Sequence, residues 1–202
     1  MSPPDRRALS PRPVHPPRTP DDGARSATTV RAMTTQQPAD GFYLRNAASA
    51  LVVRDGQVLM VRGTWPDPNS ENYWLPGGGQ QPGETLAACA EREVLEETGV
   101  RVTAGQMLLL REHIAGNHPD SNIPAETGHH RVEAIFWCEI LHEPDTLGGT
   151  QHDAPQTGIE WVPLEKVASL SMIPPFLQAL LPGLAAQAAA GTAHAFYAGD
   201  VE

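Results

Sequence analysis

The residues best suited to chemistry in this chain of 202 residues lie between positions 78 and 100. A run of three glycines leads into a segment rich in glutamate, which carries one arginine and ends at another glycine. Carboxylate oxygens are the ligands that hard cations such as Mg²⁺ and Mn²⁺ prefer, and a cation held by them can bind the oxygens of a phosphate. We therefore expect this segment to support metal-assisted chemistry on an anionic substrate.

Residues 86–98 are predicted to form a helix, because small and apolar residues recur with helical spacing and a glycine follows. At 100° per residue, Glu93, Glu96 and Glu97 fall within an arc of ~100° that spans one turn. Arg92 lies beside Glu96, where it can orient that carboxylate. Like charges at these spacings destabilise an isolated helix, so their grouping favours a cation among them, and a solvated acidic face is the alternative interpretation.

This segment resembles the signature box of the Nudix hydrolase family, the MutT-like proteins. Nine specified positions match without a departure, namely Gly78, Glu84, Arg92, Glu93, Val94, Glu96, Glu97, Gly99 and Val100. Residues 73–79 look like the family's approach to its loop–helix–loop motif, and residues 160–164 look like its late strand. The resemblance covers roughly residues 46–181. It implies an α/β fold, a Nudix-like α/β/α sandwich with a mixed β-sheet.

The resemblance also implies a function, the Mg²⁺-dependent hydrolysis of a diphosphate linkage in a nucleoside diphosphate joined to another moiety, with Mn²⁺ as an alternative ion. Carried over position by position, Glu93, Glu96 and Glu97 would hold the metal, and Arg92 would fix a glutamate by a charge-assisted hydrogen bond. We take Glu97, Arg92 and Glu96 as the catalytic candidates. The residues with a structural part in the motif would be Gly78, Glu84 and Gly99.

The general base is not determined by the motif, because the family draws it from different places. Glu97 is the first candidate, since one carboxylate could serve as both ligand and base. Asp153 is a candidate additional metal ligand or base, and a solvated loop aspartate is the alternative. Glu133 is a low-ranked base or ligand, which as a plain strand residue would face solvent. Glu126 has the weakest claim of these acids.

A non-catalytic nucleotide sensor built on the same domain is the rival function. A sensor can dispense with a metal-binding glutamate, whereas this chain retains all of them, which favours an enzyme. Net charge bears on partners: the first 40 residues carry six arginines against four aspartates, so the rest of the chain has a net charge of −12. We therefore expect a small nucleotide substrate and no stable binding of nucleic acid. Substrate selectivity is expected to lie in loops 63–72 and 115–128.

Two further groups of side chains are candidates for substrate contacts. Four histidines around the long loop could form a zinc site, contact a phosphate, or be ordinary polar residues: His113, His118, His129 and His130. Three aromatic residues could stack on a base, or could pack in the core: Trp65, Tyr73 and Trp137.

The elements that must position these residues follow from periodicity and turn chemistry. Strands are predicted at 47–54 and 57–62, joined by a two-residue turn at Asp55-Gly56. Further strands are predicted at 73–76, 100–102, 106–112, 130–140 and 158–162. In the strand at 130–140, the alternating apolar residues predict one buried and one solvated face. Helical segments are expected at 163–170, 176–181 and 184–189, the last two separated by Pro182.

The remaining segments divide the chain. Residues 1–40 hold eight of the 20 prolines and no aromatic residue. We expect them to be a disordered leader, or an artefact of a start site that really lies at Met33. Residues 41–190 are expected to form the domain, and residues 191–202 a loose tail.

Two expectations concern the setting of the protein. No apolar run approaches the ~20 residues that span a bilayer, and two cysteines cannot supply a disulfide framework. We therefore expect a cytoplasmic protein that does not cross a membrane. The edge strands are expected to meet a second copy in a homodimer.

Overall fold

A tight turn sets the register of the first two strands. Asp55 and Gly56 both have positive φ, 50° and 75°, as a two-residue hairpin turn requires. The turn pairs Arg54 with Gln57 in an antiparallel hairpin, as predicted. The computed structural model describes residues 43–119, 121, 123, 125–151 and 155–202. The predicted leader at 1–40 lies outside these ranges.

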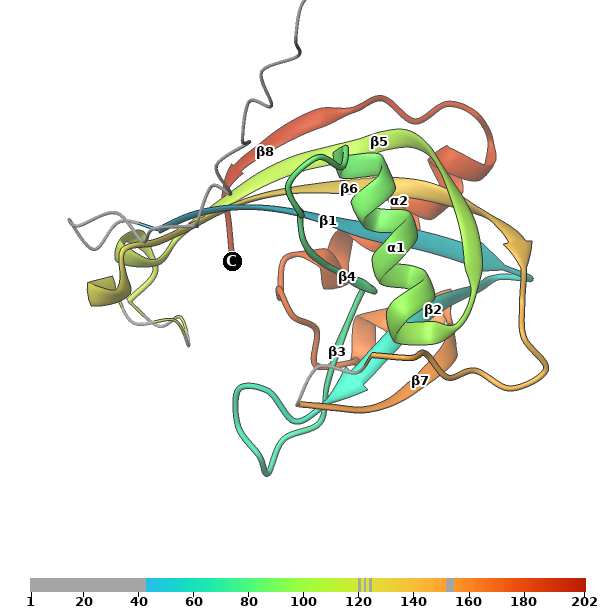
Figure 1. Cartoon of the computed structure of the whole chain (residues 1–202), viewed down its shortest axis with the longest axis horizontal. Coiled ribbons are helices and arrows are strands. Elements are labelled where there is room, and N and C mark those ends of the chain that lie inside the picture. The colour runs from blue at the N-terminus through green and yellow to red at the C-terminus, as the bar shows by residue number, and fades with distance from the viewer. Residues whose placement is uncertain (1–42, 120, 122, 124, 152–154) are drawn as a thin grey trace, which may run out of the picture. The chain divides into compact units, whose positions relative to one another are not determined.

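The described chain folds into strands and helices in mixed order (Figure 1). The strands are β1 Tyr43–Arg54, β2 Gln57–Gly63, β3 Asn72–Trp74, β4 Gly77–Gly79, β5 Arg101–Ile114, β6 His129–His142, β7 Gln156–Pro163 and β8 Phe196–Asp200. The helices are α1 Leu86–Thr98 and α2 Leu177–Ala189, with 3-10 turns η1 Ala115–Asn117, η2 Ala125–Thr127 and η3 Leu164–Ser169.

The strands form one mixed sheet whose order is β3-β2-β1-β6-β5-β8, with β4 paired to β1 and β7 to β2. β1 and β6 pair in parallel, whereas β5 and β6 are antiparallel. Helix α1 covers one face of the sheet and α2 the other (Figure 1). The predicted α/β/α sandwich with a mixed sheet is thus confirmed.

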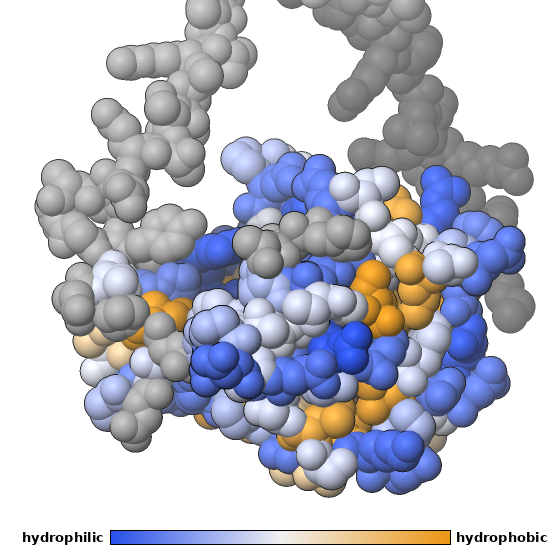
Figure 2. Space-filling view, turned by 90° about the horizontal axis from the view of Figure 1, so that it is seen from below, coloured by the Kyte–Doolittle hydropathy of each residue, from blue (hydrophilic) through white to orange (hydrophobic). Residues whose placement is uncertain are grey.

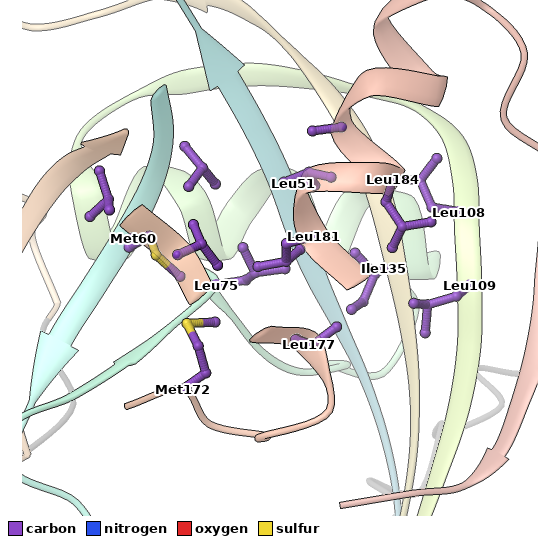
Figure 3. Packing of buried hydrophobic residues seen from close by; sticks show 14 of the residues in the cluster. Leu51, Met60, Leu75, Leu108, Leu109, Ile135, Met172, Leu177, Leu181 and Leu184 are labelled. Carbon is purple, nitrogen blue, oxygen red and sulfur yellow. The ribbon is translucent and has the colours of Figure 1, made fainter. Parts of the chain in front are cut away.

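Each face of the sheet has its own core. On the α1 side, Cys89, Ala90 and Val94 pack against small and branched residues of β1 and β6. On the α2 side, leucines of the helix pack against β1, β5 and β6 (Figure 3). Burial of both faces overturns the prediction of a strand with one solvated face at 130–140: Ala134 and Ile135 are neighbours in β6, yet both are fully buried.

Helix α1 begins and ends where its sequence predicts. The side chain of Thr85 accepts the backbone N–H of Ala88 and caps the first turn. Gly99 adopts φ 78° and donates its N–H to the carbonyl of Leu95, which ends the helix.

Three predicted elements differ from the structure. The strands predicted at 100–102 and 106–112 are one strand, β5, because bulges near Met107 absorb the extra residues. Pro182 lies within a single helix, α2, whose leucines are buried against the sheet and compensate for the lost backbone hydrogen bond. The predicted loose tail is wrong, since β8 forms there and pairs in parallel with β5.

The surface agrees with the polar composition of the domain. On the face drawn in Figure 2, hydrophobic residues form separate patches among hydrophilic ones. Within the described ranges, no helix combines the length and the apolar character needed to cross a membrane.

The loop after β6 packs tightly on the last turn of α1. The N–H groups of Gly148 and Gln151 donate to the carbonyls of Thr98 and Glu96, at 2.9 and 3.0 Å. A Cβ atom at Gly149 would stand 1.8 Å from the carbonyl oxygen of Glu96, whereas one at Gly148 would meet nothing within 4 Å. The backbone contact therefore requires glycine at position 149 alone.

We predict that Gly149→Ala destabilises the fold by roughly 2 kcal/mol, which lowers the melting temperature by roughly 4–8 °C. The matched variant Gly148→Ala should melt within about 1 °C of the wild type, because its added methyl group meets no neighbour. Differential scanning calorimetry of the three proteins measures both effects. Equal melting of the two variants would show that the loop does not contact the helix as described.

Candidate active site

One arginine gathers the acidic residues of the motif. The Arg92 guanidinium donates from Nε and Nη2 to both carboxylate oxygens of Glu84, at 3.0 and 2.7 Å. Its Nη1 donates to Glu93 at 2.8 Å and to Glu96 at 2.9 Å. Its Nη2 also donates to the carbonyl of Gly79 at 3.1 Å. All five N–H groups of Arg92 therefore have acceptors within the motif.

These contacts set the charge state of Glu84. Hydrogen bonds from Arg92 lower the pKa of Glu84 to about 2, although partial burial opposes the shift. The backbone N–H of Gln81 also donates to this carboxylate, at 2.7 Å. Glu84 therefore stays ionised and fastens the loop before α1 to the helix.

Glu97 and Glu93 connect the helix to the glycine strand β4. Glu97 is 4% exposed, and its Oε2 accepts the backbone N–H of Gly77 at 3.0 Å. The Glu93 carboxylate packs directly on Gly78, where an added Cβ would come within 2.5 Å of its carbon. Only glycine at position 78 leaves room for that carboxylate.

The predicted metal ligands share one region of the helix. Glu93 and Glu96 each place an oxygen within 2.9 Å of the same nitrogen, Nη1 of Arg92, and Glu97 is bonded to Gly77. Among the residues that the structure describes, no three His, Cys, Asp or Glu side chains are grouped so as to hold a metal ion. The donor chemistry of the three carboxylates nevertheless fits a hard divalent cation. The Glu93 carboxylate occupies the space that a side chain at position 78 would fill.

A pocket of about 420 Å³ adjoins this acidic turn. Gly77 links the pocket to the acidic turn, because it lines the pocket and donates its N–H to Glu97. The pocket wall includes two tryptophans, three arginines, a histidine and a buried carboxylate, namely Trp65, Trp74, Arg45, Arg111, Arg131, His129 and Glu133. A basic, aromatic cavity thus opens beside the carboxylates of α1.

Glu133 is hydrogen-bonded to several side chains around this pocket. Its two oxygens accept hydrogen bonds from Arg111, Arg131 and the hydroxyl of Ser49, at 2.5 to 2.8 Å. The residue is 4% exposed, so the alternative of a solvent-facing strand residue is wrong. Burial raises the pKa of Glu133, but the two arginines and Ser49 outweigh it and bring the pKa to about 2. A carboxylate held so firmly ionised is poorly suited to act as a general base at neutral pH.

Arg45 differs from the other two arginines. Its guanidinium lies against Gly79, where an added Cβ would stand 2.6 Å from its Nη2. No described carboxylate forms an ion pair with it, whereas Arg111 and Arg131 share Glu133. Only eight basic residues occur beyond position 40, and three of them line this pocket. The pocket therefore carries positive charge in an acidic domain.

The other predicted residues have separate outcomes. Asp153 lies outside the described residues, as does the side chain of Glu126. Of the four histidines, His129 lines the pocket, while the others bond to carboxylates of the C-terminal segment or of β5. Trp65 lines the pocket, but Tyr73 and Trp137 pack against the core on the α2 side.

Sequence reasoning missed the arginines of the pocket, because each lies on a different strand. Parallel pairing of β1 with β6 places Arg45 opposite Arg131, and antiparallel pairing of β5 with β6 places Arg111 opposite Glu133. A usable signal was present, since arginines within apolar strands of an acidic domain are expected to have buried partners or a ligand.

Comparison with known proteins identifies the class. A model of the NUDIX domain matches residues 43–184, which include α1, β4 and all the residues that line the pocket. The chain belongs to the NUDIX family and is a pyrophosphohydrolase by class. Hydrolases of this family in general use divalent metal ions. No curated protein matches the chain in sequence.

Solved structures share the fold at low sequence identity. A NUDIX hydrolase from Nitrosomonas europaea has a TM-score of 0.56 and 18% identity, over 75% of this chain and 93% of that one. An ADP-ribose pyrophosphatase from Streptococcus suis has a TM-score of 0.52 and 16% identity, over 76% and 98%. A C. elegans Ap4A hydrolase has a TM-score of 0.51 and 19% identity, over 72% and 98%.

We predict that Glu133 makes the stability of the protein depend on acid pH. The folded-state pKa of Glu133, about 2, lies below its ordinary value of 4.5. Its contribution is therefore fully present above pH 4.5 and is lost as the pH falls towards 2. Glu133→Gln should lower the free energy of unfolding at pH 7 and flatten its decline over that range.

Urea unfolding at a series of pH values measures this difference. The share of Glu84, whose pKa is also low, is the same in both proteins and cancels in the comparison. Parallel pH profiles for the wild type and Glu133→Gln would contradict the assignment.

Proposed function

We propose that the protein hydrolyses a diphosphate linkage in compounds of the form nucleoside–diphosphate–X, with Mg²⁺ as the cofactor and Mn²⁺ as a substitute. The proposal rests chiefly on one juxtaposition. The carboxylates of α1 and the basic, aromatic pocket meet at Gly77, whose N–H is bonded to Glu97. A diphosphate lying across Gly77 would have its phosphates beside the acidic turn and its organic groups in the pocket.

Glu93, Glu96 and Glu97 are the residues that would hold the divalent ion. When bound, such an ion supplies charge neutralisation of the diphosphate and a more acidic water. This reconciles an acidic protein with an anionic substrate. Arg92 already holds Glu93 and Glu96 at one point in space, so the protein itself positions two of the three carboxylates.

Residues of the pocket and of α1 are suited to phosphate binding, base stacking and proton transfer. Arg45 has no carboxylate partner among the described residues and is suited to bind a phosphate oxygen. Trp65 and Trp74 offer aromatic surface for a base or another planar group. Glu97, largely shielded from solvent and held by the Gly77 N–H, is our candidate for accepting the proton of the attacking water.

The acidic groups are arranged for phosphorus chemistry and not for glycoside cleavage. Glycosidases place two carboxyl groups on either side of the scissile bond. Here Glu84, Glu93 and Glu96 all converge on one guanidinium, at one side of the site.

Hydrolysis in ¹⁸O-labelled water tests the reaction class. A panel of nucleoside diphosphate derivatives, with Mg²⁺ or Mn²⁺, should yield products labelled on a phosphoryl group, with sugar and base unlabelled. Free nucleosides should not react. Label on a ribose carbon would overturn the proposal. Tight binding of a panel compound without any turnover would favour a nucleotide sensor instead.

We predict that Glu97→Gln lowers the turnover number by at least about 100-fold, because it removes the charge but keeps the shape and an acceptor for Gly77. EDTA should abolish wild-type activity, and Mg²⁺ or Mn²⁺ should restore it. Glu91→Gln is the matched control, since Glu91 lies on the same helix and accepts the N–H of Ala104 on β5.

Steady-state kinetics and thermal melting of both variants decide the outcome. Glu97→Gln should melt close to the wild type, and Glu91→Gln should retain most of the activity. If Glu97→Gln keeps more than half of the wild-type turnover, Glu97 is neither ligand nor base.

A further inference from the structure

The C-terminal strand is an addition to the matched domain. The NUDIX match ends at residue 184, whereas β8 spans Phe196–Asp200 and forms the edge of the sheet beside β5 (Figure 1). Phe196 pairs with Leu109, and Asp200 with Glu112. This strand therefore lies at the sheet edge next to β5, the strand that carries Arg111 of the pocket wall.

Asp200 holds the end of β5 through three contacts. Its Oδ1 accepts the backbone N–H of Ile114 at 2.9 Å and lies 2.7 Å from Nε2 of His118. Its Oδ2 accepts the side-chain amide of Asn117 at 2.7 Å. Burial raises the pKa of Asp200, but these hydrogen bonds outweigh it and the pKa is lowered. One ionised carboxylate thus fixes the turn η1 where the chain leaves β5.

The two residues after Asp200 continue the contact toward the pocket. The carbonyl of Val201 accepts a hydrogen bond from Nη1 of Arg111 at 3.0 Å. The Glu202 carboxylate lies 2.5 Å from Nε2 of His113. His113 stacks on His118 at 5.0 Å, and its ring centre is 6.2 Å from that of His129.

Arg111 links the C-terminal residues to the pocket wall. Its guanidinium is 5.5 Å from the ring of Phe176 and binds Glu133 through Nε and Nη2, at 2.8 and 2.7 Å. Glu133 in turn binds Ser49 and Arg131. Arg111 is 6% exposed, so its buried N–H groups need acceptors, and the Val201 carbonyl is one of them.

We propose that Asp200 is a positioning residue for the substrate pocket: it holds the C-terminal strand against β5, and so fixes Arg111 and the His113–His129 contact at the pocket wall. Substrate affinity, more than the hydrolytic step, then depends on this strand. The statement about affinity rests on the proposed function, whereas the statement about position does not.

Three variants test the claim about position and the claim about affinity. Asp200→Ala removes all three contacts. Asp200→Asn keeps an acceptor for Ile114 but cannot accept from Asn117, so its effect should be smaller than that of Asp200→Ala. Tyr197→Phe is the matched control on the same strand, because it removes one hydrogen bond, from a side chain that is 61% exposed, to Glu112.

Hydrogen–deuterium exchange of the full chain tests position without any ligand. In Asp200→Ala, exchange should speed up in peptides covering 109–118 and 129–133 but not in α1. Asp200→Asn should be intermediate, and Tyr197→Phe should match the wild type in these peptides. Unchanged exchange at 129–133 in Asp200→Ala would overturn the proposal, whatever the protein hydrolyses.

Calorimetric titration with α,β-methylene-ADP and Mg²⁺ tests affinity with a probe that cannot be cleaved between its phosphates. Asp200→Ala should bind the probe about tenfold more weakly. On the panel compound that the wild type hydrolyses fastest, KM should rise and kcat should stay within about twofold. Wild-type affinity in Asp200→Ala would overturn the link to the pocket. A wild type that neither binds nor hydrolyses these compounds would overturn the proposed function and leave the exchange result to decide the positioning.

Discussion

The ion network around Arg92 is the constraint on which the site depends. Three carboxylates, from Glu84, Glu93 and Glu96, surround one guanidinium whose N–H groups all have acceptors. Without that charge, Glu93 and Glu96 would be like charges within one turn of the helix, close to Glu84 of the preceding loop, which is unfavourable. The same guanidinium also binds the carbonyl of Gly79, so the glycine strand and the helix are held in one arrangement. Because β4 and α1 are held together in this way, Gly77 can bond to Glu97. That bond lies where the acidic turn meets the basic pocket.

Charge is distributed unevenly across the domain, and this resolves an apparent contradiction in the sequence. A net charge of −12 beyond position 40 does not suit an anionic ligand, yet the pocket wall contains three arginines for one carboxylate. Glu133 does not cancel their effect. It orders two of them, since a bidentate or shared carboxylate fixes a planar guanidinium in direction as well as in place. Arg45 stands apart on β1, where it lines the pocket and pairs with no described carboxylate.

Local features of the fold could be predicted from the sequence, and features that join distant strands could not. The turn at Asp55-Gly56 and the bounds of α1 depend on neighbouring residues, and both agree with the structure. Alternation in β6 predicts which residues share a face, but it contains no information on what covers that face. It therefore leaves Glu133 either as a base or ligand or as a solvent-facing residue, and the structure buries it. β8 was missed for a related reason. It is a short edge strand with a glycine at position 199, and its stability comes from contacts with β5 and not from its own composition.

The parallel pairing of β1 with β6 has a consequence for how the protein folds. Ser49 and Glu133 are 84 positions apart in the chain, and their contact requires closure of everything between them, whereas the β1–β2 hairpin closes over two residues. Loop-closure entropy makes such long-range pairing slow, so local hairpins and helices can form well before it. The acidic helix and its Arg92 network are almost wholly local, but the basic pocket exists only once the central strands have paired. Folding therefore assembles the two halves of the candidate site at different times, and a partly folded chain would present the carboxylates without the basic, aromatic cavity beside them.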